Sequence, residues 1–261
     1  MPPPRKASRG KNVVIEPTEI LSLRCYRERC HLSQGTKFAF TLAEVLITLG
    51  IIGIIAALII PAYTQNQKNK ATAAKLKKTY STIENALKMA EAEHGPMNNW
   101  DLADSTNFTK NYIAPYVQYY AYYQKNSHDS NSAMCIASPS EAKKIYIWMN
   151  GVGMSYPVSE HTSSIKLSNG ACIGFNNLTT NNKLLYIDIN GNENPPNTAG
   201  KDLFIYYFDK NYFIKPVGNN LNLSDDDLIN STTTYACNKK SSGGGYYCAE
   251  KIMRDNWEIK Y

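Results

Sequence analysis

The sequence is poor in the residue clusters that catalytic and metal sites use. Its 261 residues include only four histidines, and none has the spacing to a second ligand that zinc sites show. No G-x-S-x-G motif is present, and Gly243-Gly244-Gly245 lacks the Lys-Ser/Thr of a phosphate-binding loop. We therefore expect that the chain is not an enzyme. The four histidines are His31, His94, His128 and His161.

An excess of charge is also missing outside the first 39 residues. The net charge is +6, but residues 1–39 hold eight Lys and Arg against three Glu, which leaves only +1 for the rest. Nucleic-acid binding needs basic residues gathered on one face, so we expect no nucleic acid as a primary partner. A basic segment before an apolar run places the N-terminus in the cytoplasm by the positive-inside rule.

Residues 1–39 have neither sustained hydrophobic periodicity nor the apolar core of a secretory signal peptide. We interpret them as a cytoplasmic leader that is removed. Either the leader is long, or translation starts downstream of Met1. Cys25 and Cys30 lie in it, and a single C-x₄-C pair is poor evidence for zinc.

The long apolar run comes next. Glu44 is the only charged residue between Phe40 and Tyr63. As a helix these 24 residues would extend roughly 36 Å, enough to cross a hydrocarbon layer about 30 Å thick. An ionisable side chain at this depth usually has a partner and a role. The alternative is an ordinary single-pass anchor that tolerates one Glu.

The start of this run resembles the type IV prepilin signal. That signal has a small residue before the cut, Phe after it, Thr-Leu next and Glu fifth in the mature chain, which here are Ala39, Phe40, Thr41, Leu42 and Glu44. The family usually has Gly at the position of Ala39. The resemblance, to type IV pilins and type II secretion pseudopilins, implies cleavage after Ala39 and N-methylation of Phe40. It also implies that Glu44 pairs with the free amine of a neighbouring subunit during assembly.

The same resemblance implies the partners and the location. The partners would be the prepilin peptidase/methyltransferase, identical or related pilin subunits, the inner-membrane assembly platform and, before assembly, membrane lipid. The protein would be a single-pass inner-membrane protein with its C-terminal domain periplasmic or extracellular, and later part of a cell-surface filament. Pilus, secretion pseudopilus and competence system all remain open. A different class, a binding or adhesion module on a pilin-type anchor with a surface, sugar or DNA ligand, also remains open.

Helical periodicity continues beyond the membrane run. Apolar residues recur in steps of four and three, and Gly95-Pro96 supplies a stop. We predict one helix from Phe40 to about His94, apolar all round at first and amphipathic afterwards. The stripe consists of Leu76, Tyr80, Ile83, Leu87 and Ala90.

Gly53 and Pro61 interrupt the apolar half. Glycine and proline are common in membrane helices in any case. In the pilin family the corresponding stretch can lose its helical structure when subunits pack, so we consider Gly53 to Pro61 a flexible segment.

Short strand-like segments follow residue 96, which predicts an α+β fold of the pilin type, with the long helix packed on a small antiparallel sheet. The predicted parts are residues 1–39 (leader), 40–63 (membrane half of the helix), 64–95 (amphipathic half) and 96–261 (β-rich domain). The tyrosines between 112 and 123 are interpreted as the packed face of a helix or loop. The expected strands are Lys144–Met149, Ala171–Phe175, Leu184–Ile189, Leu203–Phe208 and Tyr212–Pro216.

The part after the leader holds four cysteines, an even number that suggests two disulfides outside the cytoplasm. Four cysteines allow three pairings. Proximity favours Cys237 with Cys248, a short loop like the disulfide-bounded loop of many type IV pilins, which leaves Cys135 with Cys172.

A stretch of alternating oxygen donors begins at Asp188. With Asn190, Asn192 and Asp202 it resembles the opening of a calcium loop, but Ala199 stands where the bidentate Glu would be expected. Major pseudopilins bind calcium in a loop near the C-terminus, and calcium is the one cofactor we consider here. The alternative is a turn built on Asn190-Gly191 that needs no metal.

Overall fold

The computed structural model describes residues 40–123, 135–136, 145–154, 162–176, 178, 183–230 and 235–261. The predicted leader, with Ala39, Cys25 and Cys30, lies outside these residues. The chain divides into two units, Met1–Ile52 and Gly53–Tyr261, and helix α1 begins in the first and continues into the second.

Helix α1 spans Leu42–His94 as one continuous element. It ends where Gly95 takes a positive φ of 78° and its N–H bonds to the carbonyl of Glu91 at 2.9 Å. The predicted end at His94 is confirmed. The helix begins two residues after the predicted start, because Thr41 acts as its N-terminal cap.

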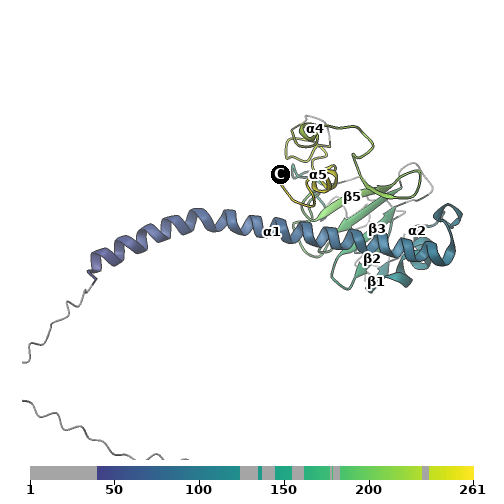
Figure 1. Cartoon of the computed structure of the whole chain (residues 1–261), viewed down its shortest axis with the longest axis horizontal. Helices are drawn as coiled ribbons and strands as arrows, with labels where there is room; N and C mark the ends of the chain where they lie inside the picture. Colours follow the sequence, from purple (N-terminus) through teal and green to yellow (C-terminus); the bar gives the residue numbers. More distant parts are fainter. Residues whose placement is uncertain are drawn as a thin grey trace, which may run out of the picture. The chain divides into compact units, whose positions relative to one another are not determined.

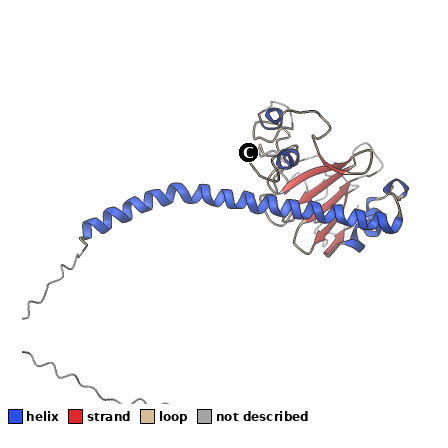
Figure 2. Cartoon of the chain, in the orientation of Figure 1, coloured by secondary structure: helices blue, strands red, loops and turns tan. Residues whose placement is uncertain are grey.

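Six antiparallel strands form one sheet in which every strand pairs with its neighbour in sequence (Figure 2). The predicted α+β fold, a long helix on an antiparallel sheet, is therefore confirmed. The strands are β1 (Tyr119–Tyr123), β2 (Thr162–Leu167), β3 (Cys172–Asn176), β4 (Leu184–Asp188), β5 (Leu203–Phe208) and β6 (Ile214–Pro216).

The second half of α1 crosses one face of this sheet (Figure 1). All five residues of the predicted stripe, from Leu76 to Ala90, are buried there. They pack against alternate strand residues such as Ile173, Ile187 and Phe204. The Tyr80 hydroxyl also donates a 2.9 Å hydrogen bond to the carbonyl of Ile214, which ties the helix to β6.

The opposite face of the sheet is covered as well. Leu184, Tyr186 and Ile205, whose side chains alternate with those facing α1, form a second core with Tyr146 and Met154. Because both faces are covered, β4 is buried at every position. The sequence predicted only the first core, since the segment that covers the second face has no hydrophobic periodicity.

Two predictions about this part of the chain are wrong. Within Lys144–Met149, the described residues 145–149 contribute only isolated bridges from Ile147 to Gly153 and to Thr198. The tyrosines do not share one helix or loop: those from Tyr119 to Tyr123 form strand β1. Strands β1 and β2 were not predicted, whereas β3 to β6 match predicted strands to within two residues at either end.

Short helices connect and flank the sheet. Helix α4 starts with a capping box in which the Ser224 hydroxyl and the Asp227 side chain exchange hydrogen bonds with each other's backbone. Ion pairs from Lys251 and Arg254 to Asp225 then join α5 to α4. The short helices are η1 (Met97–Asn99), α2 (Ser105–Phe108), η2 (Thr109–Ile113), η3 (Ala114–Tyr116), α4 (Asp225–Ile229) and α5 (Cys248–Arg254).

Candidate functional site

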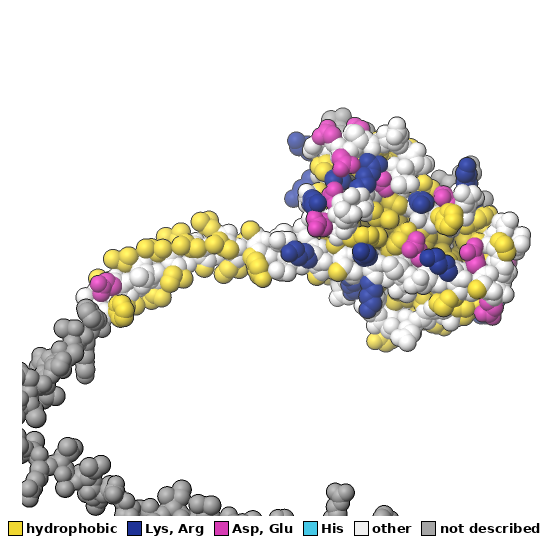
Figure 3. Space-filling model, in the orientation of Figure 1, with side chains coloured by type: hydrophobic (Ala, Val, Ile, Leu, Met, Phe, Trp, Pro, Cys, Tyr) yellow, Lys and Arg dark blue, Asp and Glu magenta, His cyan; other side chains and the backbone are white. Residues whose placement is uncertain are grey.

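Residues 40–63, which include the apolar half of α1, carry most of the exposed large hydrophobic side chains of the described chain. Their large apolar side chains, from Phe40 at 84 % exposure to Tyr63 at 61 %, all remain exposed. Figure 3 shows hydrophobic side chains along the whole visible face of this segment. By length and composition, α1 is the one helix among the described residues that could cross a membrane, with a mean hydropathy of 2.7 in its most apolar window. A surface of this kind needs a cover of lipid or protein from outside the chain.

Glu44 lies at the start of this surface and closes a capping box with Thr41. Its Oε2 atom accepts hydrogen bonds from the Thr41 backbone N–H at 2.8 Å and from the Thr41 hydroxyl at 2.9 Å. The Glu44 N–H in turn donates to the Thr41 hydroxyl oxygen at 3.2 Å. Two otherwise unpaired donors of the first helical turn are thereby satisfied. The carboxylate is held facing the amino end of the helix, toward Phe40.

This helix cap was not predicted from the sequence, although the sequence contains the pattern for it. Thr41-Leu42-Ala43-Glu44 matches the Ser/Thr-x-x-Glu pattern that precedes an apolar helix. Thr41 therefore positions the Glu44 side chain at the start of the helix.

Gly53 and Pro61 are both inside the regular helix. A proline at 61 has no N–H for the carbonyl of Ala57, which therefore lacks its partner in the helix. A Cβ added at Gly53 would meet no atom within 4 Å. The residues do not break the helix here, and their role as a flexible segment stays a prediction.

The four cysteines form the two disulfides that proximity suggested. Cys135 bonds to Cys172 and Cys237 to Cys248, with Cα–Cα distances of 5.6 and 4.9 Å. Both bonds lie against the loop that joins β4 to β5. A Cβ on Gly191 would come within 3.2 Å of the Cys172 sulfur, and one on Gly200 would clash with the Cys248 sulfur. Each disulfide thus packs closely against one glycine of this loop.

Asp188 organises the beginning of the same loop from a buried position. Its Oδ1 accepts the N–H groups of Asn190 and Gly191 at 3.0 and 2.8 Å, and its Oδ2 accepts the Tyr146 hydroxyl at 2.6 Å. Burial raises the pKa of Asp188 to about 6, even though these hydrogen bonds act in the opposite direction. Burial likewise raises the pKa of Tyr146, and the neighbouring Asp188 carboxylate adds to that effect.

Asp202 organises the end of the loop in a similar way. Its two oxygens accept the N–H groups of Asn197 and Thr198, each at 2.6 Å. Burial raises the pKa of this carboxyl group, and its hydrogen bonds partly offset the rise.

The four residues considered for calcium therefore belong to one loop, in which both carboxylates already accept backbone N–H groups. The Asn190 side chain donates to the carbonyl of Asn194, and the Asn192 carbonyl accepts from Asn197. Among the described residues, no group of three or more His, Cys, Asp or Glu side chains is arranged to hold a metal. Calcium binding at this loop stays a prediction. The turn at Asn190-Gly191 starts a loop of 14 residues rather than a tight hairpin.

Comparison with known proteins adds one relative and one family. A segment of 62 residues is 37 % identical to the Prepilin peptidase-dependent protein D of Escherichia coli (strain K12). The match covers 24 % of this chain and 42 % of that protein, so it spans less than half of the relative. No solved structure matches the chain. The model of a family of unknown function, DUF6613, matches residues 62–261, and the chain therefore belongs to that family.

Proposed function

We propose that this protein is a structural subunit of a type IV pilus or a type II secretion pseudopilus. In this proposal prepilin peptidase processes the chain after Ala39, and the subunit assembles through the apolar half of α1. The role is structural rather than enzymatic. A segment of the chain is similar to a protein named for its dependence on prepilin peptidase, and this similarity supports the proposed processing.

One observation carries the proposal: the exposed apolar half of α1 begins with a capped carboxylate. A simple anchor needs the apolar surface, and a Gln at position 44 would cap its helix as well, so an anchor has no need of a charge there. A subunit that moves from lipid into a helical bundle needs both, because packing against neighbours is not directional and a polar contact sets the register.

The geometry of Glu44 suits a contact with a neighbouring subunit. Thr41 occupies Oε2, while within the described residues no hydrogen bond reaches Oε1. Cleavage after Ala39 would give Phe40 a free amine, which the peptidase would methylate. The protonated amine of one subunit and the Glu44 carboxylate of the next would then neutralise each other away from water, where an unpaired charge is most costly.

The orientation in the membrane is part of the proposal. Basic residues flank the apolar run on both sides, with Lys68 and Lys70 shortly after Tyr63 and Lys37 shortly before Phe40. The positive-inside rule is therefore less decisive than the charge of the leader suggests. We base the cytoplasmic placement of the N-terminus on the prepilin-type signal.

The decisive test compares Glu44→Gln with Thr41→Val in the native host. Gln at position 44 keeps the capping box but removes the charge. Val at position 41 removes the capping hydroxyl, at a cost of about 1 kcal/mol to the helix start, and keeps the charge. We expect Glu44→Gln to insert into the membrane normally and to lose most filament incorporation, measured as the share of protein in sheared filaments. Thr41→Val should assemble nearly as well as the parent.

Normal incorporation of Glu44→Gln would contradict the charge pairing. Equal loss in both variants would show that Glu44 acts only as a helix cap. The amount of each variant in the membrane fraction serves as the control for expression and insertion.

A further inference from the structure

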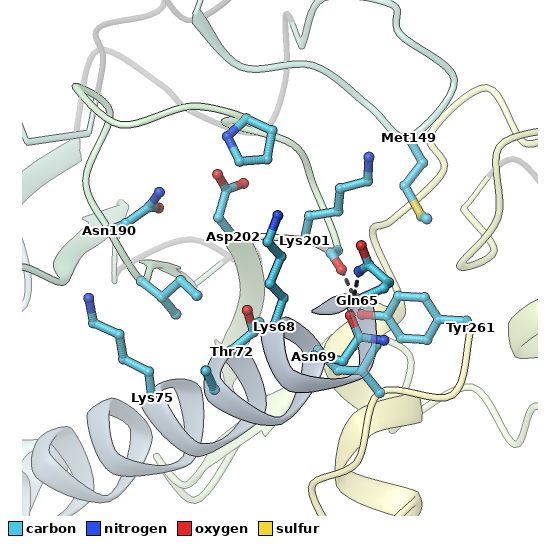
Figure 4. Close-up of a pocket in the computed structure, with 15 residues that line it drawn as sticks. Gln65, Lys68, Asn69, Thr72, Lys75, Met149, Asn190, Lys201, Asp202 and Tyr261 are labelled. Atoms are coloured by element: carbon cyan, nitrogen blue, oxygen red, sulfur yellow. Dashed lines mark hydrogen bonds between the residues drawn. The ribbon is translucent and has the colours of Figure 1, made fainter. Parts of the chain in front are cut away.

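A pocket of about 550 Å³ lies between α1 and the loop that joins β4 to β5. Lys68 and Lys75 line it from α1, and Lys201 lines it from the loop. Figure 4 shows the side chains of Lys68 and Lys201 extended on the side of α1 where the carboxylate of Asp202 lies, with Lys75 further along the helix. Apolar side chains, including Met149, Ile189 and Ile259, form part of the remaining wall, together with polar side chains such as Gln65 and Asn190.

The three ammonium groups are not neutralised by the part of the chain that the structure describes. None of them takes part in its ion pairs, which involve Lys166, Lys251, Arg254 and Lys260. The one acidic residue that lines the pocket, Asp202, directs its oxygens to the N–H groups of Asn197 and Thr198. The pocket therefore carries an excess of positive charge.

The sequence of α1 strengthens this excess. Between Glu44 and Glu84 the helix contains five lysines and no acidic residue. The pocket takes in one face of this basic stretch, from Gln65 to Lys75. An anion is the ligand that such a surface attracts.

The position of the pocket along α1 identifies the kind of anion. Lys68 follows Tyr63, the last residue of the apolar run, by five positions, which is a rise of roughly 8 Å along the helix. The polar headgroup layer on each side of a bilayer is about 5–8 Å thick. When the apolar run is in a membrane, Lys68 therefore lies at the level of the lipid phosphates.

We propose that this pocket binds the headgroup of an anionic phospholipid. Lys68 and Lys201 would hold the phosphate, and the apolar wall would contact the glycerol and the first carbons of the lipid. The buried Oδ1 atom of Asn190 has no hydrogen-bond partner among the described residues, and it would accept a headgroup hydroxyl. The proposal requires the apolar run to enter a membrane, but it requires neither cleavage after Ala39 nor filament assembly.

The test uses the full chain in a neutral detergent, titrated with short-chain phosphatidylglycerol, while its thermal unfolding is followed. Ligand binding to the folded state raises the melting temperature, and the rise grows with the logarithm of the ligand concentration above the dissociation constant. We expect phosphatidylglycerol to raise the melting temperature and phosphatidylcholine to have little effect. Lys68→Gln/Lys201→Gln should weaken the apparent affinity on the order of tenfold or more.

A matched variant controls for charge. Lys70→Gln/Lys78→Gln also removes two positive charges, but from exposed positions of α1 that do not line the pocket. This variant should keep the affinity of the parent to within about threefold. The attraction between a lysine and an anionic headgroup falls off with distance, and these two lysines do not line the pocket.

Four outcomes would overturn the proposal. They are no shift with phosphatidylglycerol, an equal shift with phosphatidylcholine, equal losses in the two lysine variants, or an equal shift with inorganic phosphate. The third would indicate diffuse attraction to the helix, and the fourth a site for soluble anions.

Discussion

The two halves of α1 both carry apolar side chains, but these side chains are buried in the second half and exposed in the first. In the second half, Leu76 and Ile83 are fully buried against the sheet of their own chain. In the first half, Leu49 and Ile52 remain exposed, at 59 % and 61 %. Both halves are regular helix, so local backbone structure does not distinguish them. The second half therefore contributes to the stability of the domain, whereas the described residues provide no cover for the first half.

The largest expected effect separates the two halves directly. Leu76→Ala should lower the free energy of unfolding of the domain by about 2–5 kcal/mol, because it leaves a cavity in the core. Leu49→Ala, the same chemical change in the exposed half, should leave that free energy within about 0.5 kcal/mol of the parent. Denaturant unfolding of the full chain in detergent measures both. Similar losses in the two variants would contradict the division.

A smaller effect concerns the domain alone and depends on pH. The folded chain holds the proton of Asp188 with a pKa of about 6, above the value near 4 expected for an unfolded chain. The contribution of this carboxyl group to stability is therefore complete below about pH 4 and is lost as the pH rises through 6. Asp188→Asn, which still accepts the N–H groups of Asn190 and Gly191, does not titrate.

We expect the free energy of unfolding of Asp188→Asn, relative to the parent, to increase between pH 4 and 7 by about 2–3 kcal/mol at most. The groups that face Asp188 are Tyr146, Asp202 and these two N–H groups. Tyr146→Phe, which removes the donor to Oδ2, should enlarge the pH dependence of the parent. A constant difference between Asp188→Asn and the parent across this range would show that the carboxyl group is not desolvated as the structure indicates.

The smallest expected effect concerns the exposed half. Gly53→Ala should stabilise the helix locally by about 0.5–1 kcal/mol, because the added methyl group meets no atom within 4 Å and alanine favours helix over glycine. Amide hydrogen exchange of the segment around residue 53 in detergent should slow accordingly, and the unfolding of the domain should not change. Unchanged exchange would argue against Gly53 as a source of flexibility.

The same contrast explains how much the sequence could reveal. The stripe from Leu76 to Ala90 was predictable, because a helix with one covered face repeats its apolar residues at a fixed period. The strand Leu203–Phe208 was predictable because a strand that is covered on both faces is a continuous apolar run. Strand β2 was not. Its Ser163 and Ser164 are buried, and Ser163 is satisfied by a 2.6 Å hydrogen bond to the carbonyl of Ser105. That contact depends on tertiary structure, so the hydrophobic pattern of the sequence does not indicate it.

The candidate site divides in the same way. Glu44 was visible as a lone charge in an apolar run, and the cysteine pairs followed from proximity in the sequence. The lysine-lined pocket was not visible, because Lys68 and Lys201 are 133 positions apart and meet only when the loop folds against α1. Asp188 and Asp202 were noticed as oxygen donors, but the sequence could not show that their oxygens would accept backbone N–H groups of the loop.

The most direct test of the central claim is the intact mass and N-terminal sequence of the protein purified from membranes of its native host. We expect a chain that begins at Phe40 and carries one added methyl group. Those two features together would place the chain on the prepilin route and make the exposed half of α1 an assembly surface. An intact leader, or a cut at another position, would contradict the account and leave a plain membrane anchor attached to the domain.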